Sequence, residues 1–368
     1  MTDKMDLEAA RCLLCERLLR YLGGLDPALR EDVNAALAME GKLLHRPALE
    51  LDGCWALLPF YLAQDLCVAT EAGQGQLEAA CDVALAMECM VCATDLLDDV
   101  MDEDTTPLIE QLGIARALNA ALALISLSQR MLLALLDLDL PVTLPARLMD
   151  AVQNAILRAS AGQQQDLLAE RRLAVNLTWE ECLEIASAKA GALLSLACQM
   201  GALCAGVEEA RVEGCAEVGR LLGIAAQLEN DAHDLYGLLQ PAGQRSSQKS
   251  DLARGKKTLP IVLAAHAIQK LGVLDARRLD FRQLELLADE EREIYLSALR
   301  EGVLATWGMA LLYRERAREH LDVLISERPA SPALYIFSIL KRIDMLSQPG
   351  RSHPDDYTEE SRKDQVFL

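Results

Sequence analysis

Residues 77–104 read LEAACDVALAMECMVCATDLLDDVMDED. Over residues 77–100 the apolar side chains recur with the i, i+3, i+4, i+7 spacing of a helix and continue nearly all round it. A helix that is apolar on every side lies in the interior of a protein. The stretch ends in a dense cluster of carboxylates. It therefore predicts a buried helix whose C-terminal end carries acidic side chains into the molecule.

Similar helical patterns follow one another along the chain, whereas strand signals are nearly absent. Clusters of Pro, Gly and Asp at residues 23–27 and 138–145 separate the patterns. Further helices are expected at residues 7–22, 112–136, 146–171, 179–205, 207–239, 259–271, 290–300, 309–325 and 333–346. This organisation predicts an all-α helical bundle.

The composition predicts one large domain. Of the 368 residues 52% are hydrophobic, and no linker rich in Pro, Gly or Ser divides the chain. We therefore expect a single domain over residues 1–348. Residues 349–368 are charged and lack periodicity, which is typical of a disordered tail, and the polar residues 243–250 are expected to form a mobile loop.

The net charge of −20 argues against a nucleic-acid partner, because phosphate backbones are held by Lys and Arg. It does not argue against a small phosphorylated substrate. Divalent cations can lie between acidic side chains and a diphosphate and so hold the two together. The charge thus favours a metal-bridged anion over direct binding of a polyanion.

The eleven cysteines fit a reducing compartment, because several lie inside apolar helical runs. Two C-x-x-C pairs, Cys12/Cys15 and Cys89/Cys92, raise the alternative of a zinc site. Both pairs lie within helical periodicity and lack the turn residues of a zinc knuckle, which favours free thiols. No signal peptide and no charge-free apolar run of membrane-spanning length is recognised, so we expect a cytoplasmic protein without a membrane span.

The first acidic motif is Asp98-Asp99-Val-Met-Asp102. Residues four apart share a helix face, so Asp98 and Asp102 lie together with Asp99 beside them. Like charges at that spacing repel one another, and a bound cation removes the cost. Magnesium typically takes one or two carboxylates together with water and phosphate oxygens. A solvated acidic helix end explains this motif equally well when it is considered alone.

A second oxygen-rich helix end changes that balance. Residues 223–234 read GIAAQLENDAHD, in which Asn230 and Asp234 are four apart and Asp231 is adjacent. Two such ends, far apart in sequence, suit opposite walls of one pocket. Metal ions held between the walls would clamp a diphosphate and help it to leave.

Basic residues that suit the same diphosphate occur in two places. Lys189 lies inside an apolar helical run, where a lone ammonium group is costly unless it meets an anion. Its alternative role is that of a surface lysine whose head reaches solvent. Residues 254–260, RGKKTLP, open the next helix. Their alternative role is a solvated basic turn.

These segments occur in the order of the motifs of trans-type isoprenyl diphosphate synthases, the polyprenyl synthetases, and of their class I terpene synthase relatives. Residues 98–102 resemble DDxxD, residues 162–166 GQxxD, Lys189-Ala190 the Lys-Thr pair, residues 227–234 QxxDDxxD, residues 255–260 GKxTLP, and residues 41–47 a damaged GGKRxRP. Each motif is weak by itself, but the ordered set from about residue 41 to residue 260 is specific.

The resemblance implies an isoprenoid synthase helical bundle with a central prenyl-diphosphate cavity, magnesium as cofactor and a homodimer. Three magnesium ions are implied, two held by Asp98 and Asp102 with Asp99 in support, and one held by Asn230 with Asp234. Asp231 belongs to the same catalytic set. The implied substrate-binding residues are Lys189, Lys256, Lys257 and Arg46 for the diphosphate, with Gln163 and Gln227 near the prenyl cation.

The departures from the family pattern concern the second substrate. In residues 41–47, GKLLHRP, the lysine is one place out of register and the middle arginine is absent. Val91 stands at the usual His position, and beyond Asp102 the usual Arg-Arg pair is missing, with residues 104–108, DTTPL, in its place. Asn230 replaces the first Asp of the second motif.

The site for isopentenyl diphosphate thus resembles an eroded one, which implies a class I terpene synthase that ionises a single prenyl diphosphate to a hydrocarbon or alcohol. The first alternative is a prenyltransferase, either a chain-elongating one such as a geranylgeranyl diphosphate synthase or one specific for another acceptor. The second is an inactive regulatory subunit, which the intact Asp98–Asp102 cluster disfavours.

The substrate's chain length is expected from the residues one turn before Asp98. Ala93 and Thr94 are small, with Met90 and Met87 deeper, so a long tail fits. A C20 substrate, geranylgeranyl diphosphate, is the first expectation and C15 farnesyl diphosphate the second. Aromatic residues make up only 4% of the chain, which favours a linear or simply cyclised product, because cyclases steady carbocations on aromatic faces.

Overall fold

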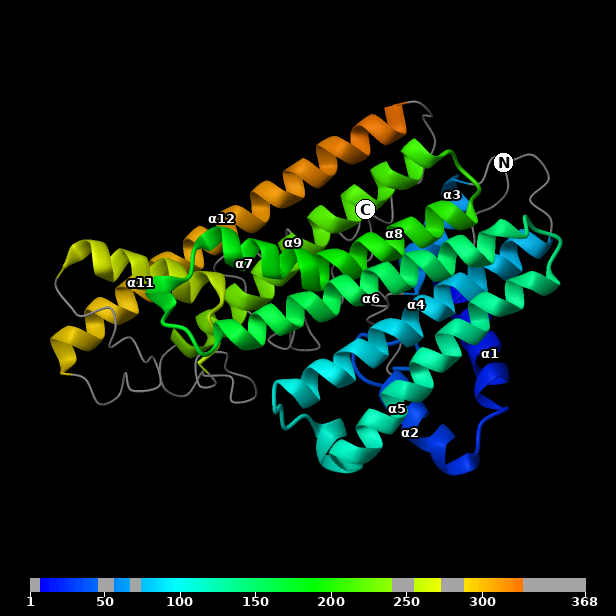
Figure 1. The fold of residues 1–368 in the computed structure, drawn as a ribbon, viewed down its shortest axis with the longest axis horizontal. Helices are drawn as coiled ribbons and strands as arrows, with labels where there is room; N and C mark the ends of the chain where they lie inside the picture. Colours follow the sequence, from blue (N-terminus) through cyan, green and yellow to red (C-terminus); the bar gives the residue numbers. More distant parts are fainter. Residues whose placement is uncertain (1–6, 46–55, 67–73, 240–254, 273–287, 327–368) are drawn as a thin grey trace, which may run out of the picture.

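A computed structural model describes residues 7–45, 56–66, 74–239, 255–272 and 288–326. Within these ranges the chain is helical and has no strand, which confirms the predicted all-α fold (Figure 1). The helices are α1 (Leu7–Leu22), α2 (Pro27–Leu37), α3 (Leu57–Leu66), α4 (Gln74–Met101), α5 (Pro107–Ala134), α6 (Thr143–Ala169), α7 (Trp179–Ala186), α8 (Ala192–Cys204), α9 (Glu209–Leu239), α11 (Leu259–Leu271) and α12 (Asp289–Ser326). Short turns lie at Leu135–Asp137 (η2), Ala174–Asn176 (η3) and Ser187–Gly191 (η4). The expected helix 333–346, the tail 349–368 and the loop 243–250 lie outside the described residues.

Helix α4 is the buried centre of the larger core, as its sequence predicts. Leu85, Met87 and Cys89 are fully buried, and the helix packs against α3, α5 and α8. Two acidic residues in the buried part of α4 are paired with hydrogen-bond donors. The Asp82 carboxylate accepts hydrogen bonds from the Arg17 guanidinium and the Tyr21 hydroxyl of α1. The Glu88 carboxylate accepts hydrogen bonds from backbone N–H groups. Because its buried charges are paired in this way, α4 can pass through the core and emerge at its acidic end.

Two expectations about helix boundaries are corrected. The pattern over residues 179–205 is not one regular helix, because α7 and α8 are joined by the π turn η4, with Lys189 at its centre. The patterns over residues 290–300 and 309–325 belong to one continuous helix, α12. Sequence periodicity also missed α2, which begins with an Asp26 cap followed by Pro27, and the short apolar helix α3.

One helix among the described residues has the length and apolar composition needed to cross a membrane. It is α5 with its η2 extension, Pro107–Asp137, and 50% of its most apolar window is buried inside the protein. The buried side includes Leu124, Leu127 and Met131 and packs on α4. The core helix of a protein that is exposed on one side can have the same length and apolar composition as a membrane-spanning helix, and α5 is such a helix.

Glycines let α9 approach the π turn more closely than other residues would. A Cβ at Gly223 would lie 2.6 Å from Gly191 Cα, and a Cβ at Gly219 would lie 2.8 Å from the backbone carbon of Leu194. The obstacles are backbone atoms, which cannot move aside like the end of a flexible side chain. The second acidic motif follows Gly223 on α9, so this close approach fixes its distance from Lys189.

Replacing Gly223 by Ala is expected to destabilise the protein by about 1–3 kcal/mol, because the added methyl group overpacks a backbone contact. The free energy of unfolding in urea measures the effect. Gly308→Ala is the matched control, since a Cβ at Gly308 on α12 meets nothing within 4 Å. It should be neutral or stabilising by about 0.5–1 kcal/mol. Equal effects of the two substitutions would contradict the packing argument.

Candidate active site

Both acidic motifs open into one cavity of about 410 Å³. Its walls come from α4, α5, α6, the α7–η4–α8 unit and α9, and residues 256–259 contribute to the wall next to α11. Of the residues predicted from sequence, the structure brings together on this cavity Thr94, Asp98, Asp102, Gln163, Lys189, Gln227, Asn230, Asp231, Asp234, Lys256 and Lys257. Segments more than a hundred residues apart in the chain thus meet around one space.

The acidic end of α4 divides its carboxylates between two directions. Asp98 and Asp102 line the cavity, as their four-residue spacing predicts. Asp99 is buried and is not part of the cavity lining. Its Oδ2 accepts a hydrogen bond from the Thr106 hydroxyl at 3.2 Å, and Thr106 in turn caps the N-terminus of α5. Asp99 therefore fastens the end of α4 to the start of the next helix.

Asp102 lies at the meeting point of three elements. Gln163 on α6 donates from Nε2 to Asp102 Oδ1 at 3.2 Å, and Lys256 Nζ lies 2.5 Å from Asp102 Oδ2. The Lys256 and Asp102 side chains are both buried. A carboxylate with both oxygens engaged is held in one orientation, so α4, α6 and the segment before α11 share a fixed reference point.

Lys189 projects from the π turn toward the same carboxylates. Its Nζ lies 2.8 Å from Asp166 Oδ2 on α6 and 3.5 Å from Asp98 Oδ1 on α4. Burial alone would lower the pKa of Lys189, but Asp166 and Asp98 outweigh it and the pKa is raised, so the ammonium stays charged. For Asp98 burial is the largest effect and raises its pKa, with Lys189 opposing. Asp166, which the sequence motif contained without a role, is the principal partner of Lys189.

The opposite wall is the oxygen-rich part of α9. Asn230 and Asp234 line the cavity, and the buried Asp231 accepts a hydrogen bond from Gln227 Nε2 at 2.9 Å. Lys257 also lines the cavity, and its Nζ donates to the Gly255 carbonyl. Arg46 lies outside the described residues.

The deeper part of the cavity is apolar, but its residues differ in part from those expected. Thr94 is on the wall, whereas Ala93, one residue earlier, is fully buried in the core together with Met90 and Met87. The apolar lining comes instead from five helices, α4 to α8, and includes Leu97, Met101, Ile125, Ile156, Ile185 and Leu193. The helical phase of α4 thus places Thr94 on the cavity wall and Ala93 in the core.

The donor set around the cavity suits magnesium that is shared with a diphosphate. Among the described residues no three His, Cys, Asp or Glu side chains are placed to hold a metal by themselves. Asp98 and Asp102 offer oxygen ligands on one wall, and Asn230 and Asp234 offer them on the other. Magnesium commonly binds through one or two carboxylates plus phosphate oxygens, so these residues fit ions that the substrate helps to coordinate.

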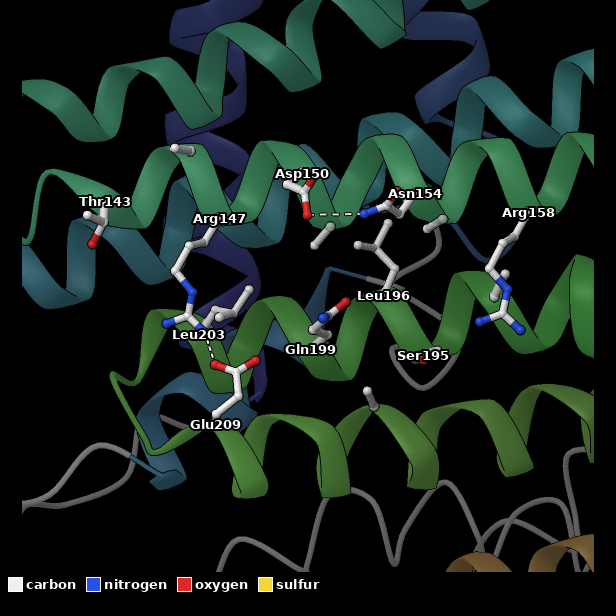
Figure 2. Close-up of a pocket in the computed structure, with 15 residues that line it drawn as sticks. Thr143, Arg147, Asp150, Asn154, Arg158, Ser195, Leu196, Gln199, Leu203 and Glu209 are labelled. Carbon is white, nitrogen blue, oxygen red and sulfur yellow. Dashed lines mark hydrogen bonds and ion pairs between the residues drawn. The ribbon is translucent and has the colours of Figure 1, made fainter.

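A second hollow, of about 700 Å³, lies between α6, α8 and the start of α9 (Figure 2). Figure 2 shows its two side-chain links: Arg147 pairs with Glu209, and Asn154 donates to Asp150. Neither acidic motif lines this hollow. The groups suited to metal and diphosphate chemistry therefore belong to the smaller cavity.

The fold is all-α, and its cavity has oxygen donors and lysines at one end and apolar side chains at the other. This combination is typical of proteins that bind a diphosphate joined to a hydrocarbon. Comparison with known families gives the particular one. The model of the family described as polyprenyl synthetase matches residues 27–278, and the chain belongs to that family.

Individual relatives agree with this assignment. The chain is 30% identical over 274 residues to the (2E,6E)-farnesyl diphosphate synthase of Mycobacterium tuberculosis, covering 72% of this chain and 74% of that protein. It is 32% identical over 213 residues to the geranylgeranyl diphosphate synthase of the same organism, covering 56% and 59%. Among solved structures, a polyprenyl synthetase from Streptomyces coelicolor A3(2) matches with a TM-score of 0.68 at 25% identity, covering 92% of this chain and 98% of the other. A geranylgeranyl pyrophosphate synthase shares the fold with a TM-score of 0.71 at 22% identity, covering 95% and 100%.

The site predicts that inorganic diphosphate and Mg²⁺ bind together and raise the melting temperature, because a ligand that binds only the folded state stabilises it. Differential scanning fluorimetry should show a rise of a few degrees with both present and little with either alone. Asp98→Asn should remove the rise. Asp150→Asn is the control and should keep the rise, since Asp150 lines the separate larger hollow. A full rise in Asp98→Asn would contradict the assignment of that wall.

Proposed function

We propose that this protein is a magnesium-dependent prenyltransferase that ionises an allylic prenyl diphosphate and joins the prenyl group to isopentenyl diphosphate. The observation that carries the proposal is the meeting of Asp98 and Asp102 with the α9 oxygens and three lysines around one apolar-ended cavity. The names of its relatives, farnesyl and geranylgeranyl diphosphate synthases, favour transfer over the single-substrate lyase that the sequence departures imply.

In the proposed reaction each wall has a separate task. Asp98 and Asp102 on α4, with Asn230 and Asp234 on α9, would hold the magnesium ions. When bound, these ions withdraw electron density from the diphosphate and make it a better leaving group. Lys189 and Lys257 lie on the same cavity and neutralise the charge that develops as the C–O bond breaks.

The rest of the lining protects the cation once it has formed. Leu97, Ile125, Ile156 and Leu193 exclude water from the hydrocarbon tail, so the cation is not captured before transfer. Gln163 and Gln227 lie at the border between the acidic and apolar parts, where their carbonyl dipoles can face positive charge. The cavity accepts C10 to C20 tails in this proposal, with C20 retained as the first expectation.

One observation favours a second candidate, a terpene synthase that uses one prenyl diphosphate. Val91 is buried in the core, and Pro107 and Leu108 form the first turn of α5. These positions therefore supply no cation to a second diphosphate. Lys42, the lysine that stands out of register, is buried and paired with Asp95. In this alternative the cation loses a proton, adds water or cyclises.

A product assay distinguishes the two functions. Purified protein with Mg²⁺ and C10, C15 or C20 prenyl diphosphate is incubated with and without isopentenyl diphosphate. The proposal predicts longer diphosphates only when isopentenyl diphosphate is present, and at least a 100-fold loss of turnover in Asp98→Ala. Hydrocarbon or alcohol from one prenyl diphosphate alone would establish the second candidate. Full activity of a folded Asp98→Ala variant would remove the metal clamp from either mechanism.

For the assembly, we propose a homodimer that buries the outer face of α5. Ile114, Leu118 and Leu122 recur every four residues there with exposed fractions of 59%, 41% and 63%. Figure 1 shows α5 on the outside of the bundle, and Leu157 on α6 is also exposed. A continuous apolar stripe of this kind is typical of a protein interface.

The double substitution Leu118→Glu/Leu122→Glu should convert the dimer to a monomer, because charges on the stripe would be desolvated at the interface. Sedimentation equilibrium measures the mass. Leu312→Glu, at an equally exposed leucine of α12, is the control and should leave the mass unchanged. A wild-type protein of monomer mass would refute this interface directly.

A further inference from the structure

Asp95 is a carboxylate of the cavity that neither acidic motif contains. It lies on α4 one turn before Asp98 and is part of the cavity lining. Its side chain is 48% exposed, whereas that of Lys42, its partner, is 6% exposed. The Lys42 ammonium contacts Asp95 Oδ2. Among the described residues no hydrogen bond is found to Oδ1, so one oxygen of Asp95 remains able to accept a proton from the cavity.

The buried Lys42 ammonium does not depend on Asp95 alone for a compensating charge. Lys42 follows α2, and burial alone would lower its pKa, yet Asp95 and Glu88 together raise it above its usual range. Glu88 is fully buried and lies two turns before Asp95 on the same helix. If Asp95 became protonated, Lys42 would still have the Glu88 carboxylate nearby. A proton can therefore reach Asp95 without leaving the buried ammonium alone in the core.

In the proposed function, the position of Asp95 suits contact with the hydrocarbon rather than with the diphosphate. Three residues of helix separate it from Asp98, which is about 4.5 Å along the helix axis. The metal-bound diphosphate would lie beside Asp98 and Asp102, so the carbons attached to it lie near Asp95. Thr94, the residue before Asp95, belongs to the same lining.

We infer that Asp95 is a catalytic base that accepts the proton which the prenyl cation loses at the end of the reaction. This inference rests on the proposed function. After the prenyl carbon has bonded to the acceptor alkene, the C–H bond next to the new cationic carbon breaks. Its electron pair forms the new double bond, and the proton goes to Asp95 Oδ1. The diphosphate has already left with the electron pair of its C–O bond, so charge and atoms balance, and water then removes the proton from Asp95.

The other ionisable groups around the apolar part are less suited to this step. Burial raises the pKa of the Cys182 thiol to about 12, so at neutral pH it is protonated and cannot act as a base. Asp166 is held by Lys189, and Asp231 accepts from Gln227. Asp104 lies beyond the end of α4, on the diphosphate side of the cavity. Asp95 thus combines access to the cavity with a position one turn before Asp98.

The test is Asp95→Asn in the full-length protein, assayed with prenyl diphosphate, isopentenyl diphosphate and Mg²⁺. The amide keeps the shape and the contact with Lys42 but is not a base. The expected result is a fall in kcat of roughly 100-fold with the KM for prenyl diphosphate changed less than two-fold. The share of prenyl alcohol should rise, because a cation that cannot lose its proton is captured by water. Asp150→Asn is the control, since Asp150 lies on α6 in the separate larger hollow, and it should keep both the rate and the product ratio.

Other outcomes overturn the inference. Asp95→Asn with the wild-type rate and products would exclude a role as base. A raised KM for isopentenyl diphosphate with unchanged kcat and products would mean that Asp95 only orients Lys42. If Asp95→Asn fails to fold by circular dichroism, Asp95→Glu decides, since it keeps the charge and moves the carboxylate by one methylene. A shifted double-bond position supports the base, and wild-type product at the wild-type rate refutes it. Wild-type protein that consumes no prenyl diphosphate would instead refute the proposed function.

Discussion

Two lysines hold the acidic end of α4 inside the protein, and the arrangement of the site depends on them. Without cations nearby, Asp98 and Asp102 would repel each other at the end of a helix that is otherwise buried. Lys256 contacts Asp102, and Lys189 lies between Asp98 and Asp166. Each lysine belongs to a different element, so the ion pairs also set where the π turn and the segment before α11 stand relative to α4.

The close backbone contact at Gly223 serves the same end. An ordinary α-helical turn at residues 187–191 would direct Lys189 differently, and the π turn changes the phase of α8 relative to α7. Because α9 approaches this turn through Gly219 and Gly223, Gln227 and Asn230 reach the cavity on the side opposite Asp98. Small residues and one irregular turn thus convert two distant acidic motifs into facing walls.

Much of this arrangement could be predicted from the sequence. The bounds of α1 agree with the pattern over residues 7–22, and the apolar periodicity of α4 correctly indicated a buried helix. Motif residues such as Asp98 and Asn230 were placed on one cavity because helical spacing constrains which face a side chain occupies. The family followed from the order of the motifs, since several weak matches in sequence are together specific.

What could not be predicted depends on contacts between distant segments. Consecutive residues on a helix point about 100° apart around its axis. Which of Ala93 and Thr94 faces the cavity therefore depends on how α4 packs against its neighbours. The short helix α3 has an apolar run with no periodic contrast, because nearly every residue in it is buried. The pair between Lys42 and Asp95 joins residues that are 53 apart, and nothing local in either segment indicates it.

The pair between Lys42 and Asp95 also bears on a difference between this sequence and those of its relatives. The departures at residues 41–47, at Val91 and at Pro107 remove cations that a second diphosphate would need, whereas the named relatives are diphosphate synthases. Lys42 remains next to the cavity residue Asp95, and its charge is balanced by Asp95 and Glu88. A second anion would compete with a carboxylate already in contact with the ammonium. In the proposed transferase, an acceptor that presents an alkene near Asp95 would need no such displacement, so its binding would depend more on its hydrocarbon part than in an enzyme with a full set of basic residues.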